Sequence, residues 1–111
     1  MGLEALSGDP FDALGDPNRR AIVELMRESD RSVGELAAAL PISRPAVSRH
    51  LKLLEHAGLV RCRAVGTRRI YGLDDEGIAA LREYLEGVWG EAAARFRLAA
   101  DNTARRAPGG T

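Results

Sequence analysis

The sequence has one cysteine, few aromatic residues and no long apolar run, and each shortage excludes a class of protein. Because a lone cysteine, Cys62, cannot form an internal disulfide, a disulfide-stabilised secreted fold is excluded and a cytoplasmic location is expected. No apolar stretch is long enough to span a bilayer. The first residues lack the basic and apolar regions of a secretory signal. We therefore expect no membrane partner.

The chain also lacks the residue groupings of an enzyme active site. It has no nucleophile with a paired base, no phosphate-binding loop and no cluster of carboxylates, so we expect no catalysis and no cofactor. A chain of 111 residues corresponds to one domain with a modest core. We expect that domain over residues 9–101, between a flexible N-terminus at 1–8 and a disordered tail at 102–111.

The net charge is zero, but the charges are not evenly distributed. Between residues 44 and 73 the charged side chains are basic except for Glu55, whereas residues 74–101 are rich in acids. A neutral total therefore conceals one basic segment, which is the feature expected of a protein that binds a polyanion.

Helix-start signals recur along the first half of the chain. Asp9-Pro10 and Asp16-Pro17 each place a capping residue before a proline, and the second helix is expected to end around Ser29-Asp30. Ser32 and Glu35 form a capping box that opens a short helix, and Ser43 caps the next helix. Two helices joined by about three residues are typical of a helix-turn-helix.

The hydrophobic period then changes from helical to alternating. Residues 60–73 predict a two-stranded β-hairpin, a wing, with Gly66-Thr67 at its turn. Asp74 is expected to cap a final long helix. The expected fold class is a mainly α winged helix-turn-helix.

The second helix of the motif has two sides. Val47, Leu51 and Leu54 share an apolar face, whereas the other side is cationic and able to form hydrogen bonds. Such a helix enters the DNA major groove, where Arg49 could bind a guanine, Ser48 a base or phosphate, and Lys52 a phosphate. A solvated surface helix is the alternative when this helix is considered alone.

The hairpin favours DNA because it gathers arginines with no neighbouring acid in the sequence. Phosphate or minor-groove contact would explain such a group. The candidate DNA-binding residues are Arg44, Pro45, Ser48, Arg49, Lys52, His56, Arg61, Arg63, Thr67, Arg68 and Arg69.

The last helix carries an apolar stripe longer than one small domain can cover, which predicts a homodimer. The expected interface residues are Phe11, Leu14, Leu81, Tyr84, Leu85, Val88, Trp89, Ala92 and Phe96. The simplest reading of Trp89 and Phe96 is dimer core, and a small-molecule pocket between the two last helices is the alternative. Cys62 is expected to face inward as a structural thiol, and His50 to pack at the core edge.

Three stretches, SVGELAAALPISRPAVSRHLKLLEHAGLV, LGDPNRRAIVELM and GTRRIYGLD, closely resemble the ArsR/SmtB family of winged-helix repressors. The resemblance covers Phe11 to about Leu85. It implies a symmetric dimer joined through the first and last helices, which represses transcription by binding a near-palindromic operator, often in its own promoter.

The sequence departs from the family at its metal sites. The positions that match one site, a pair of cysteines, hold Ser32 and Gly34. The positions that match the other site hold Asp75, Gly77, Val88 and Glu91, so its two carboxylates remain and its histidines do not. We therefore expect no bound metal.

The leading hypothesis is thus a sequence-specific repressor that binds double-stranded DNA. A small-molecule-responsive repressor and a winged-helix module used only for protein contacts are the alternatives. The sequence does not identify an effector.

Overall fold

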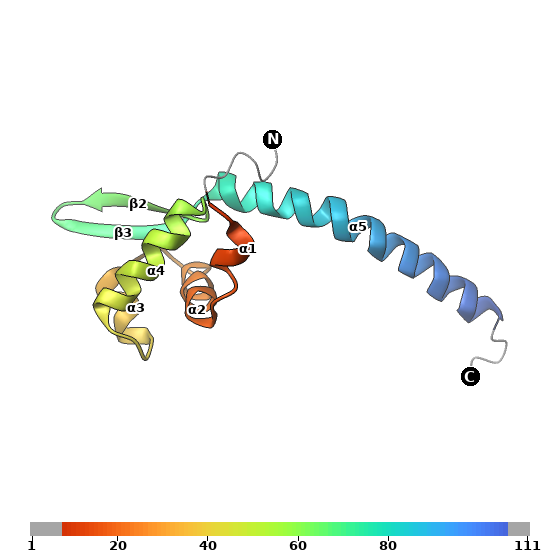
Figure 1. Ribbon diagram of the computed structural model, residues 1–111, viewed down its shortest axis with the longest axis horizontal. Coiled ribbons are helices and arrows are strands. Elements are labelled where there is room, and N and C mark those ends of the chain that lie inside the picture. The colour runs from red at the N-terminus through yellow and green to blue at the C-terminus, as the bar shows by residue number, and fades with distance from the viewer. Residues whose placement is uncertain (1–7, 107–111) are drawn as a thin grey trace. The chain divides into compact units, whose positions relative to one another are not determined.

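A computed structural model describes residues 8–106 of the 111-residue chain, with side chains described for residues 8–100. The elements follow one another as α1 (Pro10–Ala13), α2 (Pro17–Met26), β1 (Arg31–Ser32), α3 (Val33–Ala39), α4 (Arg44–His56), β2 (Val60–Val65), β3 (Arg68–Leu73) and α5 (Asp75–Arg106). Of the described residues, 8–81 form one compact unit, and the remainder of α5 forms a second unit. Figure 1 shows α2, α3 and α4 on one side of the β2–β3 hairpin.

The predicted helix starts are confirmed by their hydrogen bonds. Asp9 and Asp16 each accept from backbone amides of the following turn, at 2.9 Å from Phe11 N and 2.8 Å from Asn18 N respectively. The reciprocal capping box is present, since Ser32 N donates to Glu35 Oε1 at 2.9 Å and Glu35 N donates to Ser32 Oγ at 3.2 Å. Each cap satisfies amides that have no partner within their own helix.

The later boundaries follow the same chemistry. The Ser43 side chain accepts from Ala46 N at 3.3 Å, and Asp74 Oδ1 accepts from Glu76 N at 3.1 Å. Gly58 has a positive φ of 78°, a conformation that suits glycine and ends α4. The chain is therefore divided into elements mainly by local side chains.

Two predicted boundaries need correction. Helix α2 ends at Met26 rather than around Ser29-Asp30, because the chain must turn before Arg31 and Ser32 join the sheet. Helix α5 continues to Arg106, so residues 102–106 of the expected tail are helical, and residues 107–111 lie outside the described part. Residues 1–7 of the expected flexible N-terminus lie outside it as well.

The sheet has three antiparallel strands in the order β1-β3-β2, where the sequence predicted a two-stranded hairpin. In the added strand Arg31 pairs with Tyr71 and Ser32 with Ile70. A strand of two residues is too short to show an alternating pattern, so it could not be predicted from the sequence. The hairpin itself is confirmed, with Cys62 opposite Tyr71 and Val65 opposite Arg68.

The core lies between the helices and the base of the hairpin. Its fully buried side chains come from α2, α3 and α4, from the residue before β2 and from the start of β2: Ile22, Leu36, Val47, Leu51, Leu54, Leu59 and Val60. Burying one such aliphatic side chain contributes about 1.5–3 kcal/mol, so this cluster fixes the orientation of α4. Leu81 is also buried in this core of the single chain, and Leu14 packs against the same cluster. Their place in a dimer interface stays a prediction.

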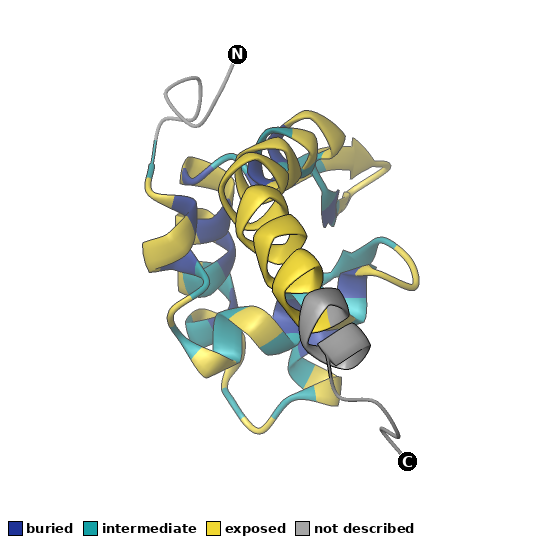
Figure 2. Ribbon diagram, turned by 90° about the vertical axis from the view of Figure 1, so that its right-hand side faces the viewer, coloured by how far each residue is buried: buried dark blue, intermediate teal, exposed yellow. Residues whose placement is uncertain are grey.

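The second unit presents a helical surface of its own. Residues 82–100 of α5 are all exposed (Figure 2). Its large exposed apolar side chains are Tyr84, Leu85, Val88, Trp89, Phe96 and Leu98. Trp89 is 60% exposed and Phe96 is 76% exposed, which leaves a helix face of unusual apolar content open in the single chain.

Candidate nucleic-acid interface

Helix α4 turns a basic face outward because its apolar residues are held in the core. Arg44, Pro45, Arg49 and Lys52 are exposed and Ser48 is half-buried, as the sequence predicted. Among residues 8–100, where side chains are described, no carboxylate forms an ion pair with Arg44, Arg49 or Lys52. The donors of this face are therefore available to an anionic ligand.

The register of the hairpin divides its arginines between two faces. Arg61 and Arg63 alternate with Cys62, so they lie on one face of β2, and Arg68 opposite Val65 shares that face. Arg69, opposite Ala64, lies on the other face with Cys62 and Tyr71. The wing therefore offers guanidinium groups in two directions.

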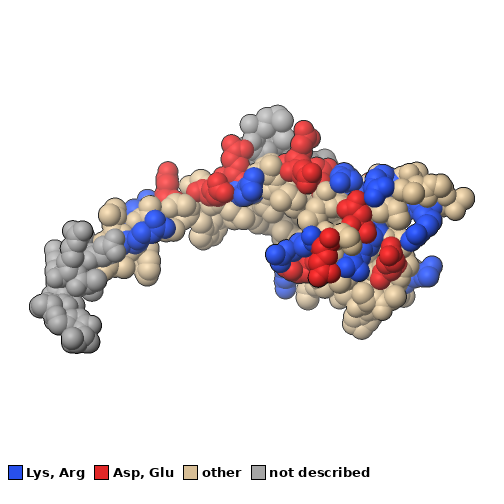
Figure 3. Space-filling model, turned by 180° about the vertical axis from the view of Figure 1, so that it is seen from behind, with Lys and Arg blue, Asp and Glu red and all other residues tan. Residues whose placement is uncertain are grey.

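The expectation that no acid lies beside these arginines is wrong in three dimensions. Asp30 Oδ2 is 3.4 Å from Arg63 Nη2 and 3.9 Å from Arg61 Nη1, and Glu35 Oε1 is 3.4 Å from Arg68 Nη2. Both acids are distant in sequence and were missed for that reason. Figure 3 shows acidic side chains among the basic ones on the compact unit. The ion pairs are at least partly exposed, so each contributes little to stability.

Asp30 reaches the hairpin because Gly72 has no side chain. A Cβ at position 72 would collide with the Asp30 carboxylate, and Gly72 is itself buried opposite Arg61. An isolated glycine within a strand pattern often marks such a close approach. Gly72 was the one sequence signal that could have indicated a group packed over the strand.

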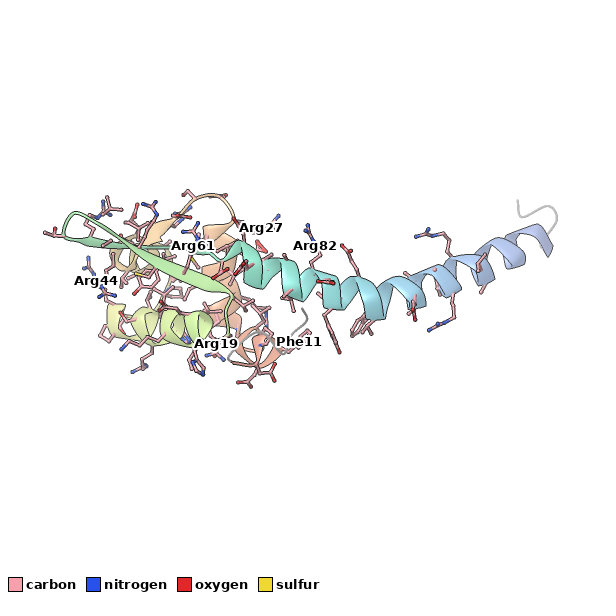
Figure 4. The ribbon with its side chains drawn as sticks, turned by 90° about the horizontal axis from the view of Figure 1, so that it is seen from above. Phe11, Arg19, Arg27, Arg44, Arg61 and Arg82 are labelled. Atoms are coloured by element: carbon pink, nitrogen blue, oxygen red, sulfur yellow. The ribbon has the colours of Figure 1, made fainter. Side chains whose placement is uncertain are left out.

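Arg44 of α4 and the consecutive wing residues Arg68 and Arg69, whose side chains leave β3 on opposite faces, border a hollow that we call the arginine hollow. It has a volume of about 390 Å³ and is lined by Ser32, Val33, Gly34, Arg44, Arg68 and Arg69. The Arg44 guanidinium packs over Gly34, with Nη2 3.0 Å from the position that a Cβ of residue 34 would take. In Figure 4 Arg44 lies at one end of α4 and Arg19 near its other end.

The predicted residues do not all gather at this end. His56 lines a separate small cavity with Asp9, Asp12 and Arg19 at the α1 side of α4. His56 ends α4 and Arg44 begins it, so the two side chains start from opposite ends of the helix. The DNA contact of His56 stays a prediction. Thr67 is exposed at the wing turn beside Gly66, whose φ is 63°.

His50 of α4 contacts α2. Its Nδ1 lies 3.3 Å from Arg19 Nη1, and Arg19 Nε donates to the Ala13 carbonyl at 2.6 Å. Because a guanidinium only donates, Nδ1 is the acceptor when this contact is a hydrogen bond. Burial alone would raise the pKa of Asp16, but amide hydrogen bonds from Arg19 and Asn18 and the Arg19 charge hold it below its ordinary value. His50 therefore packs within the domain, as expected.

Cys62 is half-buried opposite Tyr71. Burial raises the pKa of Tyr71, and a hydrogen bond with Cys62 raises it further, whereas contact with Arg69 acts in the opposite direction. These contacts place the thiol within the sheet's packing and connect it to one wing arginine. The structural role of Cys62 stays a prediction.

The positions that match the family's metal ligands have other surroundings here. Ser32 caps α3, and Arg44 covers Gly34. A Cβ at Gly77 would collide with the Gly58 carbonyl, so this backbone leaves no room for a ligating side chain there. Among the described side chains, no group of three or more histidines, cysteines or acids is close enough together to hold a metal ion. The absence of metal stays a prediction.

Comparisons with known proteins place the chain in a family. Residues 16–61 match the family described as bacterial regulatory protein, arsR family. The HTH-type transcriptional regulator Rv2034 of Mycobacterium tuberculosis is 56% identical over 79 residues, which are 71% of this chain and 74% of that protein. The HTH-type transcriptional repressor SmtB of the same species is 44% identical over 73 residues, which are 66% of this chain and 54% of that protein.

A solved structure agrees with the sequence relatives. The homodimeric winged helix-turn-helix DNA-binding domain Mb0332 of Mycobacterium bovis, a possible ArsR-family regulator, aligns with a TM-score of 0.59 and 30% identity, covering 76% of this chain and 78% of that one. The chain therefore belongs to the ArsR family of bacterial helix-turn-helix transcriptional regulators. Its relatives are regulators and not enzymes. Within the described residues, no helix combines the length and apolar character needed to cross a membrane.

Proposed function

We propose that the protein is a sequence-specific transcriptional repressor that binds a near-palindromic operator as a homodimer, with its own promoter among the targets. The observation that carries this proposal is the exposed cationic face of α4 beside the wing arginines. In this arrangement α4 enters the major groove and Arg49 reads base edges, while the wing contacts the sugar-phosphate backbone.

The dimer rests on a second observation. The apolar face of α5 beyond Leu81 is exposed in the single chain, and a homodimer would bury it. The relative from Mycobacterium bovis is homodimeric, and the SmtB relative is named a repressor. Two-fold symmetry presents two α4 helices to DNA, which suits half-sites about one helical turn apart or a multiple of it.

Selection of bound fragments from the source genome tests the proposal directly. The full chain is incubated with sheared genomic DNA at two salt concentrations, and bound fragments are sequenced. Enrichment of a few inverted repeats, including the protein's own promoter, is the expected result. Repression of a reporter placed behind the selected promoter should follow, and loss of repression in Arg49→Ala provides the matched comparison. Binding without any sequence enrichment would contradict the proposal.

A further inference from the structure

The arginine hollow is bordered by basic residues from two elements that are separated along the sequence. Arg44 is the first residue of α4, and Arg68 and Arg69 begin β3. Exposed basic residues usually spread apart in water, because like charges repel. Here three guanidinium-bearing residues line one open hollow of about 390 Å³.

The hollow has a net positive charge. Glu35 contacts Arg68 at 3.4 Å, and in the part of the chain with described side chains neither Arg44 nor Arg69 has a carboxylate partner. Because Glu35 compensates Arg68, the positive charge left at the hollow comes from Arg44 and from Arg69, whose side chain leaves β3 on the opposite face from Arg68. The Glu35 oxygen that faces Arg68 also accepts from Ser32 N at 2.9 Å, so its negative charge is shared with the capping box.

The Arg44 guanidinium packs against the backbone of Gly34 at the edge of the hollow. Its Nη2 lies 3.0 Å from where a Cβ of residue 34 would be, and its central carbon lies 3.4 Å from the same point. A Cβ at position 34 would press on the far end of a flexible side chain, which would have to shift by a few tenths of an ångström. The bare backbone of Gly34 therefore favours a guanidinium position beside the start of α3, at the hollow that the wing arginines also line.

We infer that the arginine hollow is a binding site for one phosphate group, which α4 and the wing hold together. This inference rests on the proposed function, since the source we favour is a phosphate of the DNA backbone. Guanidinium groups match phosphate oxygens in geometry and charge, and the hollow is open enough to admit a phosphodiester. A shared phosphate would fix the angle between recognition helix and wing on the duplex. A free phosphate offers the same chemistry.

The first experiment follows inorganic phosphate binding to the full chain by amide NMR, with chloride used to keep the ionic strength constant. Saturable shifts at the Gly34 amide and at the Nε groups of Arg44 and Arg69 are expected. Arg44→Ala should weaken phosphate about tenfold or more, because it removes charged hydrogen bonds. Arg27→Ala removes an equal charge from an arginine that pairs with Glu24, far in sequence from the hollow, and should leave phosphate binding unchanged.

Gly34→Ala is the sharper variant because it keeps every charge. The added Cβ would push the Arg44 guanidinium aside by a few tenths of an ångström, so phosphate affinity should fall, by less than in Arg44→Ala, while circular dichroism and thermal unfolding show a folded domain. Affinity for random-sequence duplex should fall with it, and the slope of log K against log salt should decrease by about 0.9 if one phosphate contact is lost.

Competition between duplex DNA and inorganic phosphate distinguishes a DNA backbone phosphate from a free phosphate ion. If the phosphate belongs to DNA, bound duplex occupies the hollow, and inorganic phosphate no longer titrates the Gly34 amide of the DNA complex; if it is a free ion, inorganic phosphate titrates that amide in the DNA complex with unchanged affinity. Either result supports the phosphate site. No saturable shift at Gly34, with Gly34→Ala binding random duplex as well as the wild type does, would overturn the inference while the proposed function stands. Failure of the wild type to bind any duplex would instead overturn the proposed function.

Discussion

The carboxylate of Asp30 occupies the space into which a side chain at position 72 would project, and this relationship places an acid beside the wing arginines. Arg63 and Arg61 lie 3.4 Å and 3.9 Å from the same Asp30 oxygen. A DNA phosphate that approaches these arginines therefore meets a resident negative charge. The wing is a weaker polyanion surface than its arginine content alone would indicate.

Neutralising Asp30 should strengthen binding to DNA of any sequence. Asp30→Asn keeps the shape of the side chain and removes a charge that, at about 7 Å from a phosphate in water, costs about 0.6 kcal/mol. Affinity for a random duplex at low salt should rise roughly threefold, with the gain fading as salt rises. Fluorescence anisotropy at several salt concentrations measures it.

The control for Asp30 is Glu28→Gln, which removes the same charge from a residue paired with Arg31 instead of the wing. Glu28→Gln should raise the affinity for random duplex by less than Asp30→Asn does. If Asp30→Asn bound DNA no better than Glu28→Gln, then Asp30 would act by positioning Arg61 and Arg63, and the electrostatic account would be wrong.

Recognition helix and wing should lose different properties on mutation. Arg49→Ala should relax sequence preference and cost about 1–3 kcal/mol at one position of each half-site, since it removes a base-reading fork. Arg68→Ala or Arg69→Ala should weaken all sequences more evenly and flatten the salt dependence by about one unit per phosphate contact. Specific and random duplexes compared at two salt concentrations test this. The opposite pattern would mean that the two roles are reversed.

The apolar face of α5 should control the oligomeric state. Leu85→Glu places a charge among Val88, Trp89 and other exposed apolar side chains, and the resulting chains should be monomers that bind DNA poorly. Ala94→Glu adds the same charge at an exposed position nine residues further along α5, on the opposite side of the helix. Sedimentation velocity distinguishes the variants. A wild-type chain that is monomeric at micromolar concentration would remove the basis for the dimer.

Gly77 should be intolerant of any side chain. A Cβ there would overlap the Gly58 carbonyl, which is backbone and cannot move aside without disturbing the α4 cap, so Gly77→Ala should destabilise by about 1–3 kcal/mol. Gly87→Ala lies on the same helix with open space around it and should stabilise by up to about 1 kcal/mol, because alanine favours helix. Urea unfolding measures both. If Gly77→Ala and Gly87→Ala had equal free energies of unfolding, the start of α5 would accommodate a side chain at position 77 and the prediction would be wrong.

The capping box should give the protein an acid-sensitive contribution to stability. The Ser32 amide and hydroxyl, and then the charge of Arg68, hold the pKa of Glu35 below its ordinary value of 4.5. A lowered folded-state pKa stabilises above the unfolded value, and this stabilisation is lost as the pH falls through the folded value. The stability difference between wild type and Glu35→Gln should therefore shrink below about pH 4.5. Urea unfolding at pH 7 and pH 3 measures this, and a difference that did not change would contradict it.

Local chemistry determined most of the fold. The caps at Asp9, Asp16, Ser32, Ser43 and Asp74 could be predicted because each acts on amides within its own turn. The alternation from Val60 onward indicated the hairpin for the same reason. The exposed face of α4 followed from the 3.6-residue period, so the basic residues there were predicted correctly as an outward surface.

Tertiary structure alone decided which charges meet. Asp30 and Arg63, like Glu35 and Arg68, are separated by 33 residues, and their contacts depend on how β1 joins β3 and how α3 packs beside the sheet. The same packing buries Leu81 in the core of the single chain. Sequence periodicity fixes the direction of a side chain on its own element, but long-range contacts depend on the relative placement of elements, which the core determines.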